Sequence, residues 1–80
     1  MNILQKKVYQ IFVKVLKLKN VNVLNDKSSP KNISNWDSLA HIEIITNLNK
    51  TFKIDISFDD LMKINNLKDV FKILKKYNVK

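Results

Sequence analysis

The chain has 80 residues, of which 45% are hydrophobic, so it suits one small core rather than a deep catalytic cleft joined to a cofactor-binding fold. The sequence contains no cysteine, which excludes disulfides, zinc–thiolate sites and thiol redox chemistry. The formal net charge is +8, but basic segments flank an acidic middle. Residues 1–36 carry seven Lys and one Asp (+6), and residues 61–80 carry six Lys and one Asp (+5). Between them, residues 37–60 carry five acidic residues and two Lys (−3).

The basic residues are all lysines, which argues against sequence-specific recognition of nucleic acid. Base-edge readout relies on the planar fork of Arg, which this sequence lacks. We therefore interpret the lysines as a solvated surface and expect no nucleic-acid partner. A Lys-rich helical module that binds nucleic acid or an anionic membrane is an alternative of a different class. Lysines also interrupt the apolar positions of the first twenty residues, so we expect no signal peptide and no membrane span. The expectation is a soluble, cytoplasmic monomer with a single domain over residues 1–80.

Residues 3–18 are predicted to form the first helix, because apolar residues recur there at three- and four-residue steps with lysines between them. The polar stretch over residues 20–35 contains the only proline, Pro30. It is longer than most connections, which indicates either a function or a short extra turn. Its expected contacts with the core are Val21, Val23, Leu24 and Ile33.

The second helix is predicted over residues 38–51. Asp37 is suited to N-capping this helix. The apolar residues that follow share one helical face, and they are Ile42, Ile45, Leu48 and Phe52. Apolar and charged residues then alternate over residues 52–56, as they do in a strand. A lone strand would have no partner in this chain, so we expect an ordered connection there.

Polar residues predict the starts of two further helices. Ser57, followed three residues later by Asp60, resembles a capping box and predicts a short helix over residues 58–63. The segment from Asn66 repeats this arrangement and begins a last helix that runs to about Lys76. The predicted fold is all-α, a small four-helix bundle of three longer helices and one short helix with a long first loop. Because the sequence has no glycine, we expect three asparagines to take the left-handed conformation that ends helices: Asn20, Asn65 and Asn78.

Ser38 is the leading candidate for a functional residue. It lies in the first turn of the second helix, where an exposed hydroxyl is held rigidly and where backbone N–H groups and the helix dipole favour a phosphate. Nucleophilic catalysis with His41 is disfavoured, because Asp37 at the cap would not readily orient the imidazole and no glycine is available for an oxyanion hole. Metal binding is disfavoured as well, since His41 and Glu43 point to different sides of a helix. We therefore expect no catalytic residue, no metal ligand and no enzymatic activity.

Downstream residues keep a fixed register with the serine motif, and the positions are Asp37-Ser38-Leu39, Ile42-Glu43-Ile44, Leu48, Phe52, Ile54-Asp55-Ile56, Ile64, Leu67 and Val70. In this register the sequence resembles the acyl carrier proteins. The resemblance covers residues 33–74 and implies a phosphodiester between the Ser38 hydroxyl and 4′-phosphopantetheine, whose thiol holds an acyl group as a thioester. It also implies that Asp37 helps to position coenzyme A, through Mg²⁺, in the phosphopantetheinyl transferase that installs this arm. The other implied partners are acyl-loading and acyl-transfer enzymes.

The second helix departs from this family in its charge. Family members carry several carboxylates there that meet basic patches on partner enzymes, whereas Glu43 is the only acidic residue in the body of this helix. The resemblance implies a carrier for fatty-acid biosynthesis or for a specialised lipid, polysaccharide or secondary-metabolite pathway. The charge departure weakens the case for the general fatty-acid enzymes, and Trp36 and His41 fit a more specialised carrier. An aminoacyl or peptidyl carrier with the same attachment site is the closest alternative.

Four residues near Ser38 are candidates for contacts with partner proteins: Trp36, Leu39, His41 and Glu43. Packing of the loop onto the bundle is an equally good role for Trp36. We interpret His41 as an exposed helical histidine, with contact to a phosphate on Ser38 or to an acidic group of a partner as the alternative. Four apolar residues have two possible roles. They line a cleft for the acyl chain between the second and third helices, or they only pack in the core, and they are Leu48, Ile56, Ile64 and Leu67.

Overall fold

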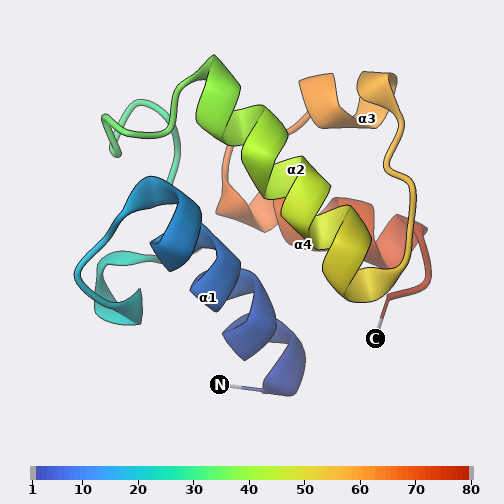
Figure 1. Cartoon of the computed structure of the whole chain (residues 1–80), viewed down its shortest axis with the longest axis horizontal. Helices are drawn as coiled ribbons and strands as arrows, with labels where there is room; N and C mark the ends of the chain where they lie inside the picture. Colours follow the sequence, from blue (N-terminus) through green and yellow to red (C-terminus); the bar gives the residue numbers. More distant parts are fainter. Residues whose placement is uncertain (1, 80) are drawn as a thin grey trace.

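The computed structural model describes residues 2–79 and contains four α-helices within them. Figure 1 shows α1 and α2 packed beside each other, with α4 behind α2 and the short α3 at the edge of the bundle. No strand occurs among residues 2–79, and residues 54–57 form an irregular connection. The predicted all-α bundle is therefore confirmed. In chain order the elements are α1 (Ile3–Leu16), a 3₁₀ turn η1 (Val21–Val23), α2 (Ser38–Phe52), α3 (Phe58–Met62) and α4 (Leu67–Lys76).

Polar side chains cap the start of every α-helix. The predicted caps Asp37, Ser57 and Asn66 each accept a hydrogen bond from a backbone N–H in the first turn of their helix. At α1 a complete capping box, which was not predicted, is present: Asn2 and Gln5 accept hydrogen bonds from each other's backbone N–H. The start of each helix is thus fixed by hydrogen bonds between residues that are close together in the sequence.

The ends of α1 and α2 correct the prediction of asparagine caps. The left-handed residues are Lys17 (φ 55°) and Lys53 (φ 54°), whereas of the predicted asparagines only Asn78 (φ 64°) has a positive φ. In each case the next residue is apolar, and its N–H donates to a carbonyl of the last helical turn. These apolar residues, Leu18 and Ile54, pack against the core. The position of an apolar anchor, and not the preference of asparagine for left-handed geometry, decides where the helices end.

Each long helix contributes one row of buried residues to the core. Residues from the connections complete the core. The long loop before α2 contributes Leu24 and Trp36, and the loop is also tied to the start of α4 by hydrogen bonds from the Leu67 N–H to the Ser28 carbonyl and from the Lys68 N–H to the Asp26 carbonyl. Of the four predicted loop anchors, Leu24 is buried, Val21 and Ile33 are partly buried, and Val23 is exposed. The buried apolar residues are Val8, Tyr9, Phe12, Leu16, Leu24, Trp36, Ala40, Ile44, Ile45, Leu48, Ile56, Ile64, Leu67, Val70 and Leu74.

The attachment of α3 is polar, because its one buried residue is Asp60. The Asp60 carboxylate accepts hydrogen bonds from the Lys76 ammonium at 2.9 Å and from the Tyr77 hydroxyl at 2.7 Å. The Ser57 N–H donates to the Tyr77 hydroxyl at 2.9 Å. Ser57 therefore caps α3 as predicted, but Asp60 turns toward α4 instead of completing the capping box. The hydrogen bond from Lys76, and then that from Tyr77, lowers the pKa of Asp60 from 3.8 to about 2.

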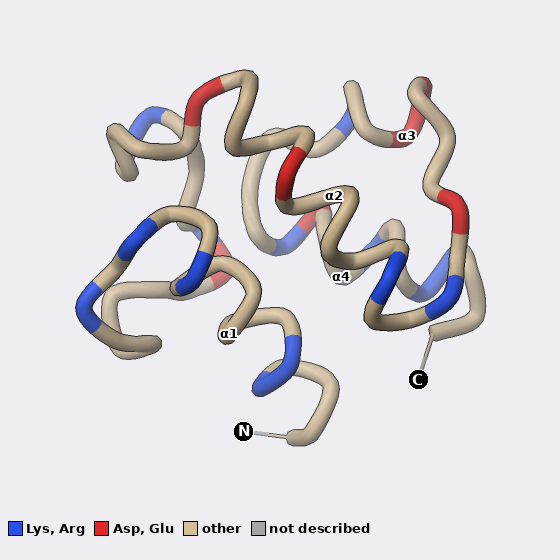
Figure 2. Tube along the Cα trace, viewed as in Figure 1, with Lys and Arg blue, Asp and Glu red and all other residues tan. Residues whose placement is uncertain are grey.

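Charge follows the segments seen in the sequence. Figure 2 shows acidic residues at the start and middle of α2 and lysines at its end. Asp37 at the start and Lys50 in the last turn of α2 both complement the helix dipole. Among the helices of residues 2–79, none has the length and apolar character needed to cross a bilayer.

Candidate functional site

Ser38 is the first residue of α2, and its side chain is exposed. Asp37 holds it there, because an Asp37 carboxylate oxygen accepts a 2.9 Å hydrogen bond from the Ala40 N–H. The backbone of Asp37 is extended, and the helix begins at the next residue. The Ser38 hydroxyl therefore lies on a rigid helix start beside backbone N–H groups that have no partner within the helix.

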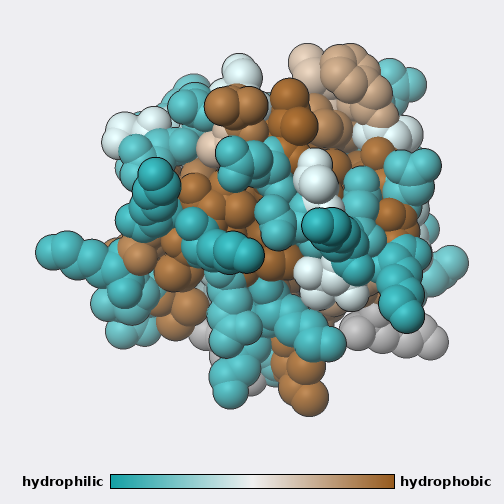
Figure 3. Space-filling view, viewed as in Figure 1, coloured by the Kyte–Doolittle hydropathy of each residue, from teal (hydrophilic) through white to brown (hydrophobic). Residues whose placement is uncertain are grey.

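An apolar pocket of about 500 Å³ opens beside Ser38 between α2, α3 and the long loop. In the space-filling view, apolar side chains gather over the first half of α2 and over α3 (Figure 3). Phe58 is 72% exposed and Met62 is 63% exposed, so α3 presents an unburied apolar face at this opening. The lining residues are Pro30, Trp36, Asp37, Ser38, His41, Ile42, Phe58, Leu61, Met62 and Ile64.

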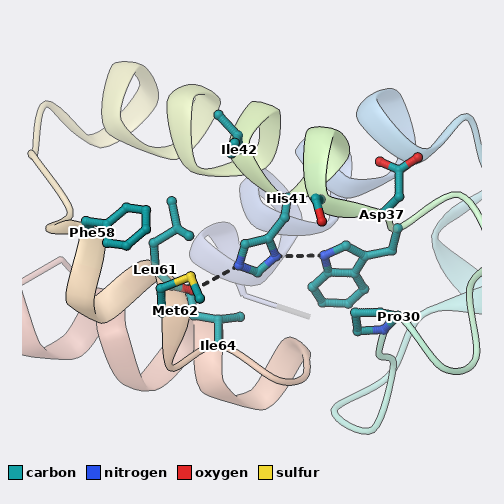
Figure 4. Close-up of a pocket in the computed structure, with 10 residues that line it drawn as sticks. Pro30, Asp37, His41, Ile42, Phe58, Leu61, Met62 and Ile64 are labelled. Atoms are coloured by element: carbon teal, nitrogen blue, oxygen red, sulfur yellow. Dashed lines mark hydrogen bonds between the residues drawn. The ribbon is translucent and has the colours of Figure 1, made fainter.

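His41 lies across the floor of this pocket and is held at both ring nitrogens (Figure 4). Its Nδ1 is 2.9 Å from the Trp36 indole Nε1, and its Nε2 is 2.9 Å from the Leu61 carbonyl oxygen. The indole N–H can only donate and the carbonyl can only accept. His41 is therefore the neutral tautomer with its proton on Nε2. We call this chain of two hydrogen bonds the Trp36–His41–Leu61 bridge.

The bridge changes the roles expected for two of its members. Trp36 is only 2% exposed, and its ring packs edge-on against Phe12 and lies side by side with the His41 ring, so its role in the structure is to pack the loop onto the bundle. His41 is half-buried, and the interpretation of an exposed histidine is wrong. Because both of its nitrogens are already bonded, His41 offers no free nitrogen to Ser38, either as a base or as a partner for a phosphate. Leu39 and Glu43 are exposed on α2, and their partner roles remain predictions.

The residues expected to line an acyl cleft are mostly core residues. Leu48, Ile56 and Leu67 are buried and lie outside the pocket, so only Ile64 of that set lines it. The lining residues of α3 were not among the residues predicted from the sequence. Their signal was present in the sequence, because Phe58 and Met62 are four residues apart and share one helical face that lies off the core stripe.

The fold and the site together define a small helical domain with an exposed serine at a helix start beside an apolar pocket. Residues 6–74 match the family described as "Phosphopantetheine attachment site". The chain is also 37% identical over 65 residues to an acyl carrier protein of Buchnera aphidicola subsp. Schizaphis graminum (strain Sg), and the match covers 81% of each chain. The chain therefore belongs to the acyl carrier protein family of phosphopantetheine-binding carriers.

Family membership confirms the cofactor expected from the sequence. The phosphopantetheine-binding domain of an acyl carrier protein carries covalently attached 4′-phosphopantetheine. The role of such a domain is to carry acyl groups between acyl-handling enzymes.

Proposed function

We propose that this protein carries acyl groups as thioesters on 4′-phosphopantetheine joined to the Ser38 oxygen. The observation that carries the proposal is the position of Ser38, exposed in the first turn of α2 and at the rim of an apolar pocket. Attachment at this point gives the arm access to solvent and partner enzymes, while an acyl chain on its thiol can return to the pocket.

Installation of the arm fits the residues at the start of α2. In the proposed reaction the Ser38 oxygen bonds to the pantetheine-bearing phosphorus of coenzyme A, and the pyrophosphate bond breaks to release 3′,5′-ADP. The hydroxyl proton passes to the transferase. The product is a phosphodiester whose charge lies beside the free N–H groups and the positive dipole end of α2. Asp37 fixes this geometry as the cap and also positions coenzyme A through Mg²⁺ in the transferase.

Partner recognition is assigned to the exposed residues of α2. Leu39 is 69% exposed next to Ser38, and Glu43 lies on the exposed side of α2 one turn further on. An exposed apolar residue beside a single carboxylate offers a partner enzyme one hydrophobic contact and one ion pair. The small number of acidic residues supports a specialised lipid, polysaccharide or secondary-metabolite pathway, because carriers of the general fatty-acid enzymes rely on several such pairs.

Incubation with coenzyme A, Mg²⁺ and a broad-specificity phosphopantetheinyl transferase, followed by intact-protein mass measurement, tests the attachment site. We expect a gain of one phosphopantetheine unit that Ser38→Ala abolishes. Ser34→Ala is the matched control, because Ser34 is an exposed serine of the preceding loop, and it should gain the full mass. No gain, or a gain that persists in Ser38→Ala, would overturn the proposal.

A second measurement distinguishes an acyl carrier from an aminoacyl or peptidyl carrier. The phosphopantetheine-bearing protein is offered acyl-activating and aminoacyl-activating ligases, and the thioester product is identified by mass. The apolar lining of the pocket favours acyl groups, so loading with fatty acids is expected. Exclusive loading with an amino acid would favour the other class of carrier.

A further inference from the structure

The pocket beside Ser38 has two unlike sides. Its outer side is apolar and exposed, and it consists of Ile42 on α2 and Phe58 and Met62 on α3. Its inner side is crossed by His41, which spans the space between the loop and α3 (Figure 4). A chain that begins at Ser38 thus meets apolar side chains at the rim and a hydrogen-bonded aromatic pair at the floor.

Beyond this floor lies the core. Trp36 is buried and contacts Phe12 of α1, whose side chain is fully buried among the long helices. The rings of Trp36 and His41 lie side by side with their planes inclined by 21°, and they therefore stand between the pocket and the interior of the bundle. Toward Phe12, a chain could go deeper only by displacing one of these two rings; the other buried side chain that lines the pocket is Ile64.

Displacing either ring would break hydrogen bonds that have no substitute in an apolar chain. Displacement of either ring separates the indole N–H of Trp36 from its acceptor, and displacement of His41 also removes one donor from the Leu61 carbonyl, which keeps the Ile64 N–H. A methylene chain can replace neither partner, and an unpaired polar group in an apolar site is unfavourable. The bridge therefore opposes deeper entry by chemistry as well as by volume.

We propose that the Trp36–His41–Leu61 bridge is the inner stop of the pocket and makes His41 a specificity-determining residue for the carried chain. The proposal deepens the proposed function and rests on attachment of the arm at Ser38. Short acyl groups are buried between the bridge and the outer apolar side chains. The additional carbons of longer acyl groups remain at the surface, where they gain no protection from this protein.

The experiment attaches alkyl chains directly at position 38, without a transferase. The sequence has no cysteine, so Ser38→Cys creates a unique thiol at the pocket rim. Alkyl methanethiosulfonates from ethyl to hexadecyl modify it: the thiolate attacks the sulfenyl sulfur, a disulfide forms and methanesulfinate leaves. The melting temperature is then measured for each chain length, in the Ser38→Cys background and with His41→Ala added.

With His41 present, the melting temperature is expected to rise with chain length for the shorter alkyl groups and then to level off. With His41→Ala the rise continues to longer chains, because the floor is open. Trp36→Phe keeps an aromatic ring but removes the indole N–H, and it should move the plateau in the same direction by a smaller amount. Lys50→Ala, at an exposed position of α2 outside the pocket lining, is the matched control and should leave the plateau unchanged.

The same dependence on chain length in all these proteins would overturn the inner stop, as would a rise without a plateau while His41 is present. If His41→Ala does not fold, Trp36→Phe decides the question alone. The alkyl series also tests the inner stop independently of the proposed attachment of phosphopantetheine at Ser38, because it uses no transferase. A serine that the transferase leaves unmodified refutes the proposed function, whereas the plateau and its response to His41 test the pocket itself.

Discussion

The Tyr77 hydroxyl donates a 2.7 Å hydrogen bond to the buried carboxylate of Asp60, and this contact joins the end of α4 to α3. The Lys76 ammonium lies 2.9 Å from the same carboxylate. Asp60 is only 3% exposed, and it is the one buried acidic residue within residues 2–79. The position of α3, and with it the outer side of the pocket, therefore depends on this polar cluster.

The cluster predicts an acid-sensitive contribution to stability. The pKa of Asp60 falls from 3.8 to about 2 in the folded protein, because Lys76 and Tyr77 hydrogen-bond to the carboxylate form. A lowered pKa means that this contribution is fully present above about pH 4 and is lost as the pH falls toward 2. Asp60→Asn should therefore destabilise the protein at pH 7 and reduce the loss of stability between pH 4 and 2. Urea unfolding across this pH range measures both effects.

Asp59→Asn is the control for that experiment, because Asp59 is the exposed neighbour of Asp60 on α3. It should leave stability at pH 7 nearly unchanged and keep the acid-dependent loss. If Asp59→Asn and Asp60→Asn behave alike, the ion pair with Lys76 does not explain the acid response.

Tyr77→Phe should lower the free energy of unfolding by about 1 kcal/mol, because it removes the acceptor of the Ser57 N–H and one of the two donors to Asp60 Oδ2, which keeps Lys76. Tyr9→Phe is the matched control, since the Tyr9 ring is buried against Phe71 and its hydroxyl makes no hydrogen bond among residues 2–79. Urea unfolding monitored by circular dichroism measures the difference. A larger loss in Tyr9→Phe would contradict the role assigned to the Tyr77 hydroxyl.

Two substitutions separate the structural and chemical roles of Asp37. Asp37→Ala removes the cap of α2 and should lower the free energy of unfolding by about 1 kcal/mol. Asp37→Asn keeps an equally good cap but removes the charge, so stability should hardly change. If Asp37 also positions coenzyme A through Mg²⁺, Asp37→Asn still slows installation of the arm. Normal installation in Asp37→Asn would reduce Asp37 to a cap.

Charge reversal tests which surface partner enzymes recognise. Glu43→Lys should slow arm installation and acyl transfer a few-fold, because one exposed ion pair contributes about 0.2–1 kcal/mol. Lys6→Glu, on the exposed side of α1, should have little effect. Rates measured at low and high salt provide the comparison, and the difference should shrink at high salt. Equal effects of the two reversals would identify the lysine-rich surface as the recognition element.

The left-handed backbone conformation of Lys17 and Lys53 marks positions where glycine should be stabilising. Lys53 has φ 54°, a conformation that costs a residue with a Cβ atom about 1–2 kcal/mol and costs glycine almost nothing. Lys53→Gly should therefore raise the free energy of unfolding by about 1 kcal/mol. Lys50→Gly, three residues earlier within α2, should lower it by about 0.5–1 kcal/mol. A melting temperature that falls in Lys53→Gly would contradict this reasoning.

Much of the fold could be predicted from local patterns. The spacing of apolar residues located the helices, and Asp37, Ser57 and Asn66 marked three helix starts, because an N-cap acts on its own first turn. The left-handed ends could not be found in this way. Lys17 and Lys53 adopt that conformation because the apolar residues after them fold back on the core, and that packing depends on the tertiary structure.

The candidate site was predictable only in part for the same reason. Ser38 could be singled out because its position depends on the neighbouring cap, Asp37. The bridge could not, because His41 meets a carbonyl oxygen twenty residues away, and a backbone acceptor leaves no trace in the sequence. Asp60 was assigned to a capping box, and its true partners on α4 are distant in sequence.

The polar attachment of α3 has a thermal consequence. Unfolding of the bundle exposes apolar surface, which gives unfolding a large positive heat capacity change and a strongly curved dependence of stability on temperature. Release of α3 breaks hydrogen bonds and an ion pair, and the apolar contact that it removes from the core is that of the partly buried Leu61, so its heat capacity change should be much smaller than that of the bundle. The free energy of releasing α3, which carries the outer side of the pocket, should therefore vary little with temperature. The free energy of unfolding of the core varies much more over the same range.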